Sequence, residues 1–244
     1  MTTIVAGAEV ASELSGKLRQ FNQTLTEAEK ANFKLLLGLA AGGLTPGFRR
    51  PEVGVAADAF DTVGETLAGL QPYSKRISSN GIAYRGRPEF MNDELLAALQ
   101  AEARQLRPSA IRFDEHFLGC GAPLANELAV SPMLTEFVRT YAGDVLPTGV
   151  ASFLFYDEPG QGIDPHIDTD IFSLNVLLML EHEHGPEQES ALVVFPPRSA
   201  PERLELVPGE VVIMFAGSIA HGRERMGPNE TVSILTFGFH PLGI

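Results

Sequence analysis

The strongest constraint on this chain is a change of pattern near residue 148. From there on the sequence consists of short runs rich in Val, Ile, Phe and Leu, punctuated by Gly and Pro: GVASFLFYD, IFSLNVLLML, SALVVFPP, ERLELV, GEVVIMFAG and TVSILTFGF. Short apolar runs with regular turn signals predict a β-sandwich or jelly roll rather than alternating strands and helices. We therefore predict a β-core over residues 148–244.

The first 147 residues are predicted to be mainly helical, because helix start signals recur there and glycines close the segments. The first expected helix, LTEAEKANFKLLLGLAAGG, begins with a Thr26–Glu29 capping box, and the second, PEVGVAADAFDTVGETLAGL, has Pro51 in its first turn. The third, NDELLAALQAEARQL, has Asn92 or Asp93 as its cap, and the fourth, SPMLTEFVRTYAG, has Ser131 as its cap before Pro132. The segments 73–90 and 109–119 are expected to add strands or loops. Because no linker separates the two parts, we predict a single domain over 1–244, with an N-terminal helical layer over 1–147.

Composition narrows the class of partner. The chain has 18 Lys and Arg against 31 Asp and Glu, a net charge of −13, and such a surface repels nucleic-acid phosphates. The absence of Trp also disfavours a base-stacking platform. No apolar run approaches the length of a membrane span. The single cysteine, Cys120, excludes an internal disulfide and fits a reducing cytoplasm. We therefore expect a cytoplasmic protein that acts on a small molecule.

The segment GIDPHIDTDIF, residues 162–172, carries the clearest sign of chemistry. Residues i and i+2 of a strand point to the same face, so His166 and Asp168 are expected to aim an imidazole and a carboxylate at one point. A later histidine, His221, follows the strand-like run PGEVVIMFAGSIA and is flanked by the small residues Ala220 and Gly222. Two histidines and one carboxylate on one side of an octahedral metal leave three positions open, as in non-haem Fe(II) oxygenases.

These residues carry a resemblance to a known superfamily. The phrases FLFYDEPGQGIDPHID and PGEVVIMFAGSIAHG resemble the HxD…H pattern of the Fe(II)/2-oxoglutarate-dependent dioxygenases, in particular the prolyl-hydroxylase-like branch. The resemblance covers roughly residues 148–240 and implies an α+β chain whose core is a double-stranded β-helix, a cupin-like jelly roll. It also implies that Tyr156, on the strand before the first histidine, faces the co-substrate.

The function implied by the resemblance is hydroxylation of a small-molecule substrate, such as an amino acid or a natural-product intermediate. His166, Asp168 and His221 would hold Fe(II), while 2-oxoglutarate and O₂ would take the open positions. Related halogenases have a small residue where Asp168 stands, so the carboxylate favours hydroxylation. Desaturation and cyclisation stay open, because the outcome depends on how the substrate is placed. The sequence does not indicate an oligomeric state.

The chain departs from this superfamily at the anchor for the distal carboxylate of 2-oxoglutarate. Most members carry Arg or Lys about ten residues after the second histidine, but here Thr231 and Ser233 occupy those positions. A buried carboxylate needs a cationic partner. Our first choice for this anchor is Arg225 and our second is Arg223, with Thr231 and Ser233 as added hydroxyl donors. More distant candidates are Arg85, Arg87 and Arg112.

Two other functions stay open at this point. One is an Fe(II) and O₂ oxidase that uses no keto acid, which the missing anchor would explain. The other is a non-catalytic, cupin-like metal-binding protein.

Several further polar residues allow more than one interpretation. Tyr156 is either a core residue or a co-substrate contact, and Asn175 is either a satisfied core amide or a pocket donor. Asp164 and Asp170 are expected to be turn or cap residues rather than ligands, although Asp170 would share a strand face with Asp168 and could bind a polar substrate. The remaining histidines are expected to be structural (His116, His240) or to lie in a solvated hairpin loop, EHEHGPEQE (His182, His184).

Overall fold

The structure is a computed structural model of the chain. It describes residues 3–26, 29–30, 33, 36–37, 40, 54–69, 80–113, 115–168, 170–185, 190–196 and 199–242. None of the helices in these ranges combines the length and the apolar character that a membrane crossing needs.

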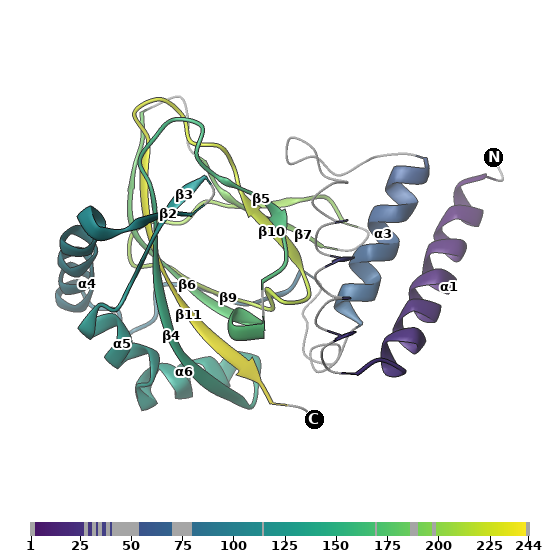
Figure 1. The fold of residues 1–244 in the computed structure, drawn as a ribbon, viewed down its shortest axis with the longest axis horizontal. Helices are drawn as coiled ribbons and strands as arrows, with labels where there is room; N and C mark the ends of the chain where they lie inside the picture. The colour runs from purple at the N-terminus through teal and green to yellow at the C-terminus, as the bar shows by residue number, and fades with distance from the viewer. Residues whose placement is uncertain are drawn as a thin grey trace.

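Two antiparallel sheets face each other and form a jelly roll (Figure 1). The larger sheet has seven strands in the order β1-β9-β6-β11-β4-β3-β2, and the smaller has four in the order β5-β10-β7-β8. Their bounds are β1 (Ile82–Gly86), β2 (Ile111–Phe113), β3 (His116–Cys120), β4 (Val145–Tyr156), β5 (Ile163–His166), β6 (Leu174–Glu183), β7 (Leu192–Phe195), β8 (Glu202–Leu204), β9 (Val211–Met214), β10 (Ala220–Arg223) and β11 (Thr231–Pro241). The predicted α+β fold with a jelly-roll core is therefore confirmed.

The central strands β4, β6, β9 and β11 of the larger sheet carry buried apolar side chains on both faces, which explains why their sequences are nearly continuous apolar runs. Because side chains alternate along a strand, every second residue joins a different core. On β4, Phe153 and Phe155 belong to a cluster outside the jelly roll, while Leu154 and Tyr156 belong to the cluster between the two sheets. The strands β6, β9 and β11 alternate in the same way.

Three helices cover the outer face of the larger sheet: α4 (Asp93–Leu106), α5 (Pro123–Ala129) and α6 (Pro132–Ala142) (Figure 1). Two of the predicted helix starts are confirmed by side-chain caps, which satisfy amides that the first turn leaves unpaired. Asn92 accepts a hydrogen bond from the Leu95 amide, and Ser131 accepts one from the Leu134 amide. At the other end of α6, Gly143 has a φ of 77°, a left-handed conformation that favours glycine.

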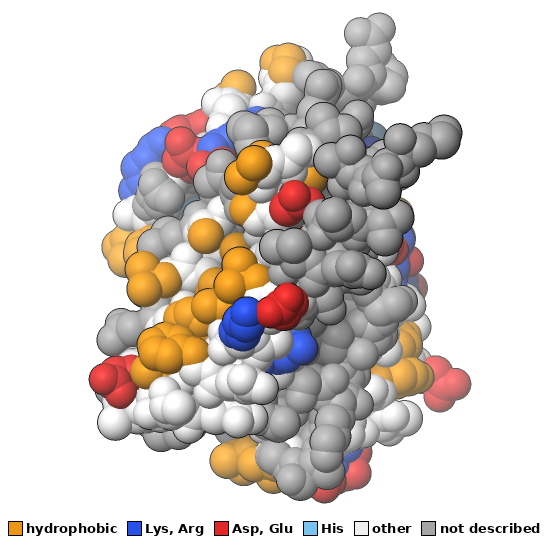
Figure 2. Space-filling model, turned by 90° about the vertical axis from the view of Figure 1, so that its right-hand side faces the viewer, with side chains coloured by type: hydrophobic (Ala, Val, Ile, Leu, Met, Phe, Trp, Pro, Cys, Tyr) orange, Lys and Arg blue, Asp and Glu red, His pale blue; other side chains and the backbone are white. Residues whose placement is uncertain are grey.

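Two helices described over their full length, α1 (Thr3–Gln23) and α3 (Val55–Ala68), lie on the opposite side of the molecule (Figure 1). Phe60 and Leu67 of α3 pack against Phe195 and Ala220 on the outer face of the smaller sheet. On the other side of α3, Ser15 of α1 donates a hydrogen bond to Glu65. Figure 2 views this side and shows exposed hydrophobic side chains among polar ones.

The boundaries of the two predicted parts differ in detail from the structure. Strand β4 begins at Val145, and three strands of the larger sheet, β1 to β3, come from the part predicted to be mainly helical. The segments 73–90 and 109–119 therefore extend the sheet, as far as they are described. The described residues also form two short 3₁₀ helices, η2 (Arg107–Ser109) and η3 (Asp170–Phe172).

The helix predicted after Thr26 is described only in part. The Thr26 amide donates to Glu29 Oε2 over 2.8 Å, and the Glu29 amide donates back to Thr26 Oγ1 over 3.4 Å. The predicted capping box is therefore present. Much of the rest of this helix, and Pro51 at the start of the next, lie outside the described residues.

Candidate functional site

Three predicted residues converge in the space between the two sheets. One ligand atom each of His166, Asp168 and His221 lies within 4.8 Å of the other two. Asp168 Oδ1 lies 3.3 Å from His166 Nε2 and 3.5 Å from His221 Nε2. Two imidazole nitrogens and one carboxylate oxygen are the donor set of a 2-His-1-carboxylate metal site. The described part of the chain contains no other cluster of His, Cys, Asp and Glu with such spacing.

The backbone brings these residues together differently from our prediction. His166 is the last residue of β5, and it stands directly opposite His221 in the antiparallel pairing of β5 with β10. Asp168 lies beyond the strand, where its amide donates to the carbonyl of Ala216 over 2.9 Å. The two ligands in the HxD segment thus share no strand face, because the strand ends between them. The alternative that Asp170 shares a strand face with Asp168 is wrong, because Asp170 begins the 3₁₀ helix η3.

His221 also reaches the site by another route than expected. The preceding run PGEVVIMFAGSIA is not one strand, because β9 ends at Met214 and a turn leads into β10 of the other sheet. The two histidines are consequently cross-strand neighbours of one sheet, with ring centroids 4.6 Å apart. Such a pair holds two side chains at a fixed short spacing.

Both histidines are oriented by backbone carbonyls. His166 Nδ1 lies 2.8 Å from the Asp164 carbonyl oxygen, and His221 Nδ1 lies 3.0 Å from the Ile219 carbonyl oxygen. A carbonyl can only accept, so Nδ1 carries a proton in each ring and Nε2 faces the centre, where it offers a lone pair whenever the ring is neutral. This arrangement is typical of metal-binding histidines.

Asp168 is held from the opposite sheet. Asn175, on β6, donates from Nδ2 to Asp168 Oδ2 over 2.8 Å, which leaves Oδ1 facing the two histidines. The Asn175 side chain is therefore a support for the carboxylate rather than a plain core amide. Its own Oδ1 is buried and has no hydrogen-bond partner among the described residues.

The electrostatics of the cluster favour an ionised carboxylate. Burial by itself would raise the pKa of Asp168, but the charge of His221 and hydrogen bonds from both histidines hold that pKa far below its ordinary value. Burial opposes the charged form of His166, and its hydrogen bond with Asp168 outweighs this and raises the His166 pKa. In the folded chain the centre therefore pairs an anionic ligand with two imidazoles.

The three side chains open into a pocket between the sheets, which is in part open to solvent. Hydrophobic side chains make up much of the wall, and the polar lining residues are Tyr156, His166, Asp168, Asn175, His221, Arg223 and Thr236.

Two of the residues predicted to bind the co-substrate line this pocket. Tyr156 is 1% exposed, and burial raises the pKa of its hydroxyl far above the ordinary value, so the hydroxyl stays protonated. Arg223 is 3% exposed, and its guanidinium carbon lies 5.6 Å from the centre of the Tyr156 ring. Arg223 follows His221 by two residues on β10, so the two side chains share a face.

The other predicted co-substrate residues lie elsewhere. Arg225 is partly exposed and pairs with Glu115 and Asp164 outside the pocket lining. Thr231 and Ser233 project from the other face of β11, where they line a separate surface pocket. Ile234 and Thr236, two and four residues after Val232 on the same strand, line the central one. The distant candidates also have other contacts, Arg85 with the Glu205 carbonyl, Arg87 with Asp93, and Arg112 with Glu158.

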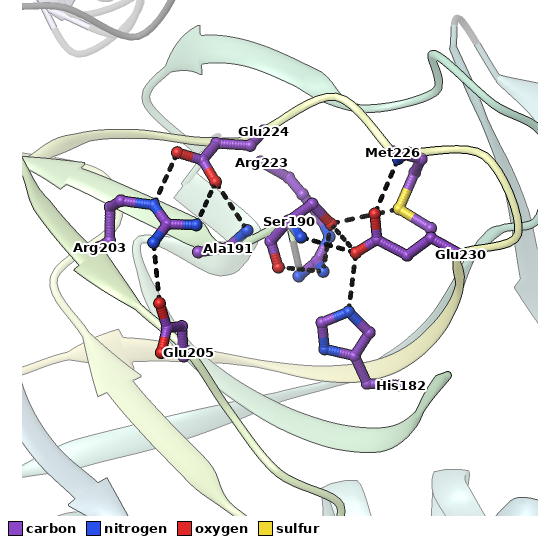
Figure 3. Close-up of polar contacts among 10 residues, drawn as sticks. His182, Ser190, Ala191, Arg203, Glu205, Arg223, Glu224, Met226 and Glu230 are labelled. Carbon is purple, nitrogen blue, oxygen red and sulfur yellow. Dashed lines mark hydrogen bonds and ion pairs between the residues drawn. The ribbon is translucent and has the colours of Figure 1, made fainter. Parts of the chain in front are cut away.

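The prediction of a solvated loop at His182 is wrong. His182 lies on β6, its side chain is 3% exposed, and its Nε2 is 2.8 Å from Glu230 Oε1. Figure 3 shows Glu230 also meeting Ser190, which contacts Arg223. No sequence pattern singles out Ser190 or Glu230, because they meet only where the turns before β7 and β11 lie together.

Comparison with known proteins identifies a shared fold. No family model and no curated protein matches the sequence. Among solved structures, the non-heme alpha-ketoglutarate-dependent epimerase SnoN from nogalamycin biosynthesis aligns at a TM-score of 0.57 with 16% identity, over 70% of this chain and 82% of that one. A Pseudomonas putida prolyl-4-hydroxylase aligns at 0.53 with 20% identity, over 72% and 100%. EctD from S. alaskensis, solved with 2-oxoglutarate and 5-hydroxyectoine, aligns at 0.55 with 14% identity, over 72% and 80%. At these identities the similarity establishes the fold.

Proposed function

We propose that this chain, which has the fold of the Fe(II)/2-oxoglutarate-dependent oxygenases, is itself such an enzyme and hydroxylates a small molecule. The observation that carries the proposal is the convergence of two imidazole nitrogens and one carboxylate oxygen within 4.8 Å. That cluster lies in a pocket that also holds a buried arginine.

The donor set fits a divalent iron. Once they lose the Nε2 proton, His166 and His221 present Nε2 lone pairs beside the ionised oxygen of Asp168, and each group is fixed by a second hydrogen bond. Three protein ligands on one side leave room for small ligands on the other. Bound Fe(II) would supply the oxidative chemistry with 2-oxoglutarate and O₂, and the protein would supply the geometry and the enclosed pocket.

We assign the recognition of 2-oxoglutarate to Arg223 and Tyr156. Arg223 brings a cation into a largely apolar pocket, where a carboxylate is a favourable partner for a guanidinium. The protonated hydroxyl of Tyr156 is a donor beside it. At the usual anchor position on β11 this chain has Thr231 and Ser233, which carry no charge. In our proposal Arg223 on β10 supplies the positive charge instead. For this reason we prefer a keto-acid-dependent enzyme over an oxidase that uses only Fe(II) and O₂.

A small-molecule substrate is supported by the largely apolar lining of the pocket beside the metal ligands and by two similar structures. SnoN has been solved with Fe³⁺, alpha-ketoglutarate and nogalamycin RO, and HygX from Streptomyces hygroscopicus with nickel, 2-oxoglutarate and hygromycin B. Hydroxylation is the outcome we propose, because Asp168 fills the position that a halide would need.

The test is an anaerobic titration of the protein with Fe(II) and then 2-oxoglutarate, followed by admission of O₂ and measurement of succinate. We expect one equivalent of iron to bind, 2-oxoglutarate to bind only afterwards, and succinate to form. O₂ uptake that does not depend on 2-oxoglutarate would favour the oxidase, and iron binding without any O₂ uptake would favour a binding protein. Iron binding that survives removal of His166 and His221 would overturn the proposal.

A further inference from the structure

Arg223 is connected to a chain of buried polar groups that leads away from the pocket (Figure 3). Arg223 Nη2 donates to Ser190 Oγ over 2.9 Å and to the Ser190 carbonyl over 3.1 Å. Ser190 Oγ in turn lies 2.6 Å from Glu230 Oε1. The serine is thus a bridge between a buried guanidinium and a buried carboxylate.

The direction of the Ser190 hydroxyl follows from its neighbours. A hydroxyl has one proton to donate, and a guanidinium has no acceptor. The proton therefore goes to the Glu230 carboxylate, and a lone pair of the same oxygen faces Arg223. Met226 Sδ also lies 3.3 Å from this oxygen, but a carboxylate at 2.6 Å is the stronger acceptor.

Glu230 is fixed in place as a buried anion. Its Oε1 accepts from the Ser190 amide over 2.7 Å and lies 2.8 Å from His182 Nε2, while its Oε2 accepts from the Gly227 amide over 2.8 Å. The side chain is 1% exposed. Burial opposes ionisation, but these hydrogen bonds outweigh it and lower the pKa of Glu230 to about 2. The group is therefore ionised at neutral pH.

The local sequence brings the carboxylate to this position. In MGPNE, residues 226–230, Asn229 has a φ of 63°, a left-handed conformation that asparagine tolerates in turns. The turn folds Glu230 back onto the amide of Gly227 just before β11 begins. His182 reaches the same carboxylate from β6, so Glu230 is fixed by two elements and Ser190 transmits that position to Arg223.

We infer that Ser190 and Glu230 are positioning residues for Arg223 and set the preference of the pocket for a keto acid with a distal carboxylate. The inference rests on the proposed function, in which Arg223 receives that carboxylate. The hydroxyl of Ser190 fixes Nη2 of the guanidinium, and the charge of Glu230 polarises the hydroxyl. Without them Arg223 would keep its charge and its hydrogen bond to the Ser190 carbonyl, but Nη2 would lose the side-chain acceptor that sharpens its orientation toward the incoming carboxylate.

The experiment compares two ligands of equal carbon number on the Co(II)-loaded protein under calorimetry. 2-Oxoglutarate has the distal carboxylate, and 2-oxopentanoate has a methyl group in its place. A hydrogen bond to a charged group is worth about tenfold in affinity. We therefore expect Ser190→Ala and Glu230→Gln to weaken 2-oxoglutarate binding about tenfold and to leave 2-oxopentanoate binding unchanged.

A neighbouring carboxylate supplies the matched control. Glu224 accepts a hydrogen bond from the amide of Ala191, next to Ser190, and pairs with Arg203 (Figure 3). It therefore lies beside the Arg223–Ser190–Glu230 contacts without being part of them. Glu224→Gln should leave the ratio of the two affinities unchanged. If Glu230→Gln does not fold, Ser190→Ala, which removes one oxygen atom, carries the test.

The possible results separate the inference from the proposed function. If Ser190→Ala and Glu230→Gln weaken the binding of both ligands to the same extent, the two residues have a merely structural role and the inference is overturned. Suppose that Ser190→Ala and Glu230→Gln keep the wild-type preference for 2-oxoglutarate over 2-oxopentanoate, and that Arg223→Met loses it. The inference would then be overturned, while Arg223 would still be the anchor. If the wild-type protein shows no preference for 2-oxoglutarate, the proposed function fails and the inference fails with it.

Discussion

The two faces of the larger sheet differ in what they bury. Its outer face meets α4, α5 and α6 through hydrophobic side chains such as Leu99, Leu134 and Phe237. Its inner face meets the smaller sheet across a pocket that contains Asp168 and Arg223. Both faces belong to the same strands, since alternate residues of β4, β6, β9 and β11 point to opposite sides.

This difference separates stability from chemistry. Apolar burial on the outer face stabilises the fold without any requirement on orientation. On the inner face each buried charge costs free energy unless it is paired and hydrogen-bonded, so its neighbours are constrained as well. We therefore expect outer-face substitutions to act on stability alone, and inner-face substitutions to act on binding or, for a buried charge, on a stability that depends on pH. Four substitutions test this, from the largest expected effect to the smallest.

Removal of a metal ligand should have the largest effect and should act on binding alone. We expect His166→Ala to lower the affinity for Fe(II) by about a thousandfold or more, since loss of even a group that supports a ligand costs about 10- to 100-fold. The thermal midpoint of the metal-free protein should change little, because the His166 side chain is about one-third exposed. Anaerobic calorimetry and thermal unfolding measure the two quantities.

The control for this variant is His184→Ala, at an exposed histidine after β6. It should bind iron as the wild-type protein does. If His166→Ala keeps the iron affinity of the wild-type protein, the inner face does not hold the metal at this site and the proposed site is wrong.

Truncation of a core side chain on the outer face should show the reverse. Leu134 of α6 is 1% exposed and packs in the outer cluster, so Leu134→Ala should lower the free energy of unfolding by about 2–5 kcal/mol. Its iron affinity should stay unchanged. Met133→Ala, one residue earlier and exposed, should cost much less. Urea unfolding measures the stability, and a loss of iron affinity in Leu134→Ala would contradict the comparison.

Glu230 should show what a buried charge contributes on the inner side. Its folded-state pKa of about 2, against an ordinary value of 4.5, corresponds to about 3 kcal/mol of stability. Because the folded-state pKa is lowered, this stability is present above pH 4.5 and is lost as the pH falls toward about 2. Glu230→Gln should therefore be less stable than the wild-type protein by about 3 kcal/mol at pH 7.

The pH dependence is the sharper measurement. Below pH 4.5 the stability difference between wild type and Glu230→Gln should shrink by about 1.4 kcal/mol per pH unit. Glu136→Gln, at an exposed glutamate of α6, should show no such trend. A difference that stays constant from pH 7 to pH 3.5 would mean that the stabilisation is not due to the charge.

The fold was largely predictable because its signals are local. The apolar runs after residue 148 correspond to strands, and the caps at Asn92 and Ser131 begin α4 and α6. Patterns of this kind depend on neighbours within a few residues. The sequence indicates β2 and β3 less clearly, because such short strands carry a pattern that also fits loops.

The candidate site was predictable only where residue type and order suffice. The order of the two histidines and Asp168 indicated that they meet, although the path of the backbone differed. The roles of His182 and Glu230 were not accessible, because their contact joins residues 48 positions apart in the sequence and depends on the register of β6 with β11. The choice between Arg223 and Arg225 depended on a similar detail, the residue at which β10 ends.

That choice gives the smallest predicted effect. Arg223 is the last residue of β10 and points into the pocket, whereas Arg225 lies in the following turn and pairs with Asp164 and Glu115. Partly exposed ion pairs contribute about 0–1 kcal/mol. Arg225→Met should therefore change the affinity for 2-oxoglutarate by less than about fivefold. Arg223→Met should instead abolish the preference for 2-oxoglutarate over 2-oxopentanoate. The two variants carry the same substitution two positions apart. Calorimetry on both therefore tests whether the effect depends on pointing into the pocket or only on lying near His221 in the sequence. The reverse result would place the anchor outside the space between the sheets, and the comparison of the two faces would then no longer describe where this protein binds a carboxylate.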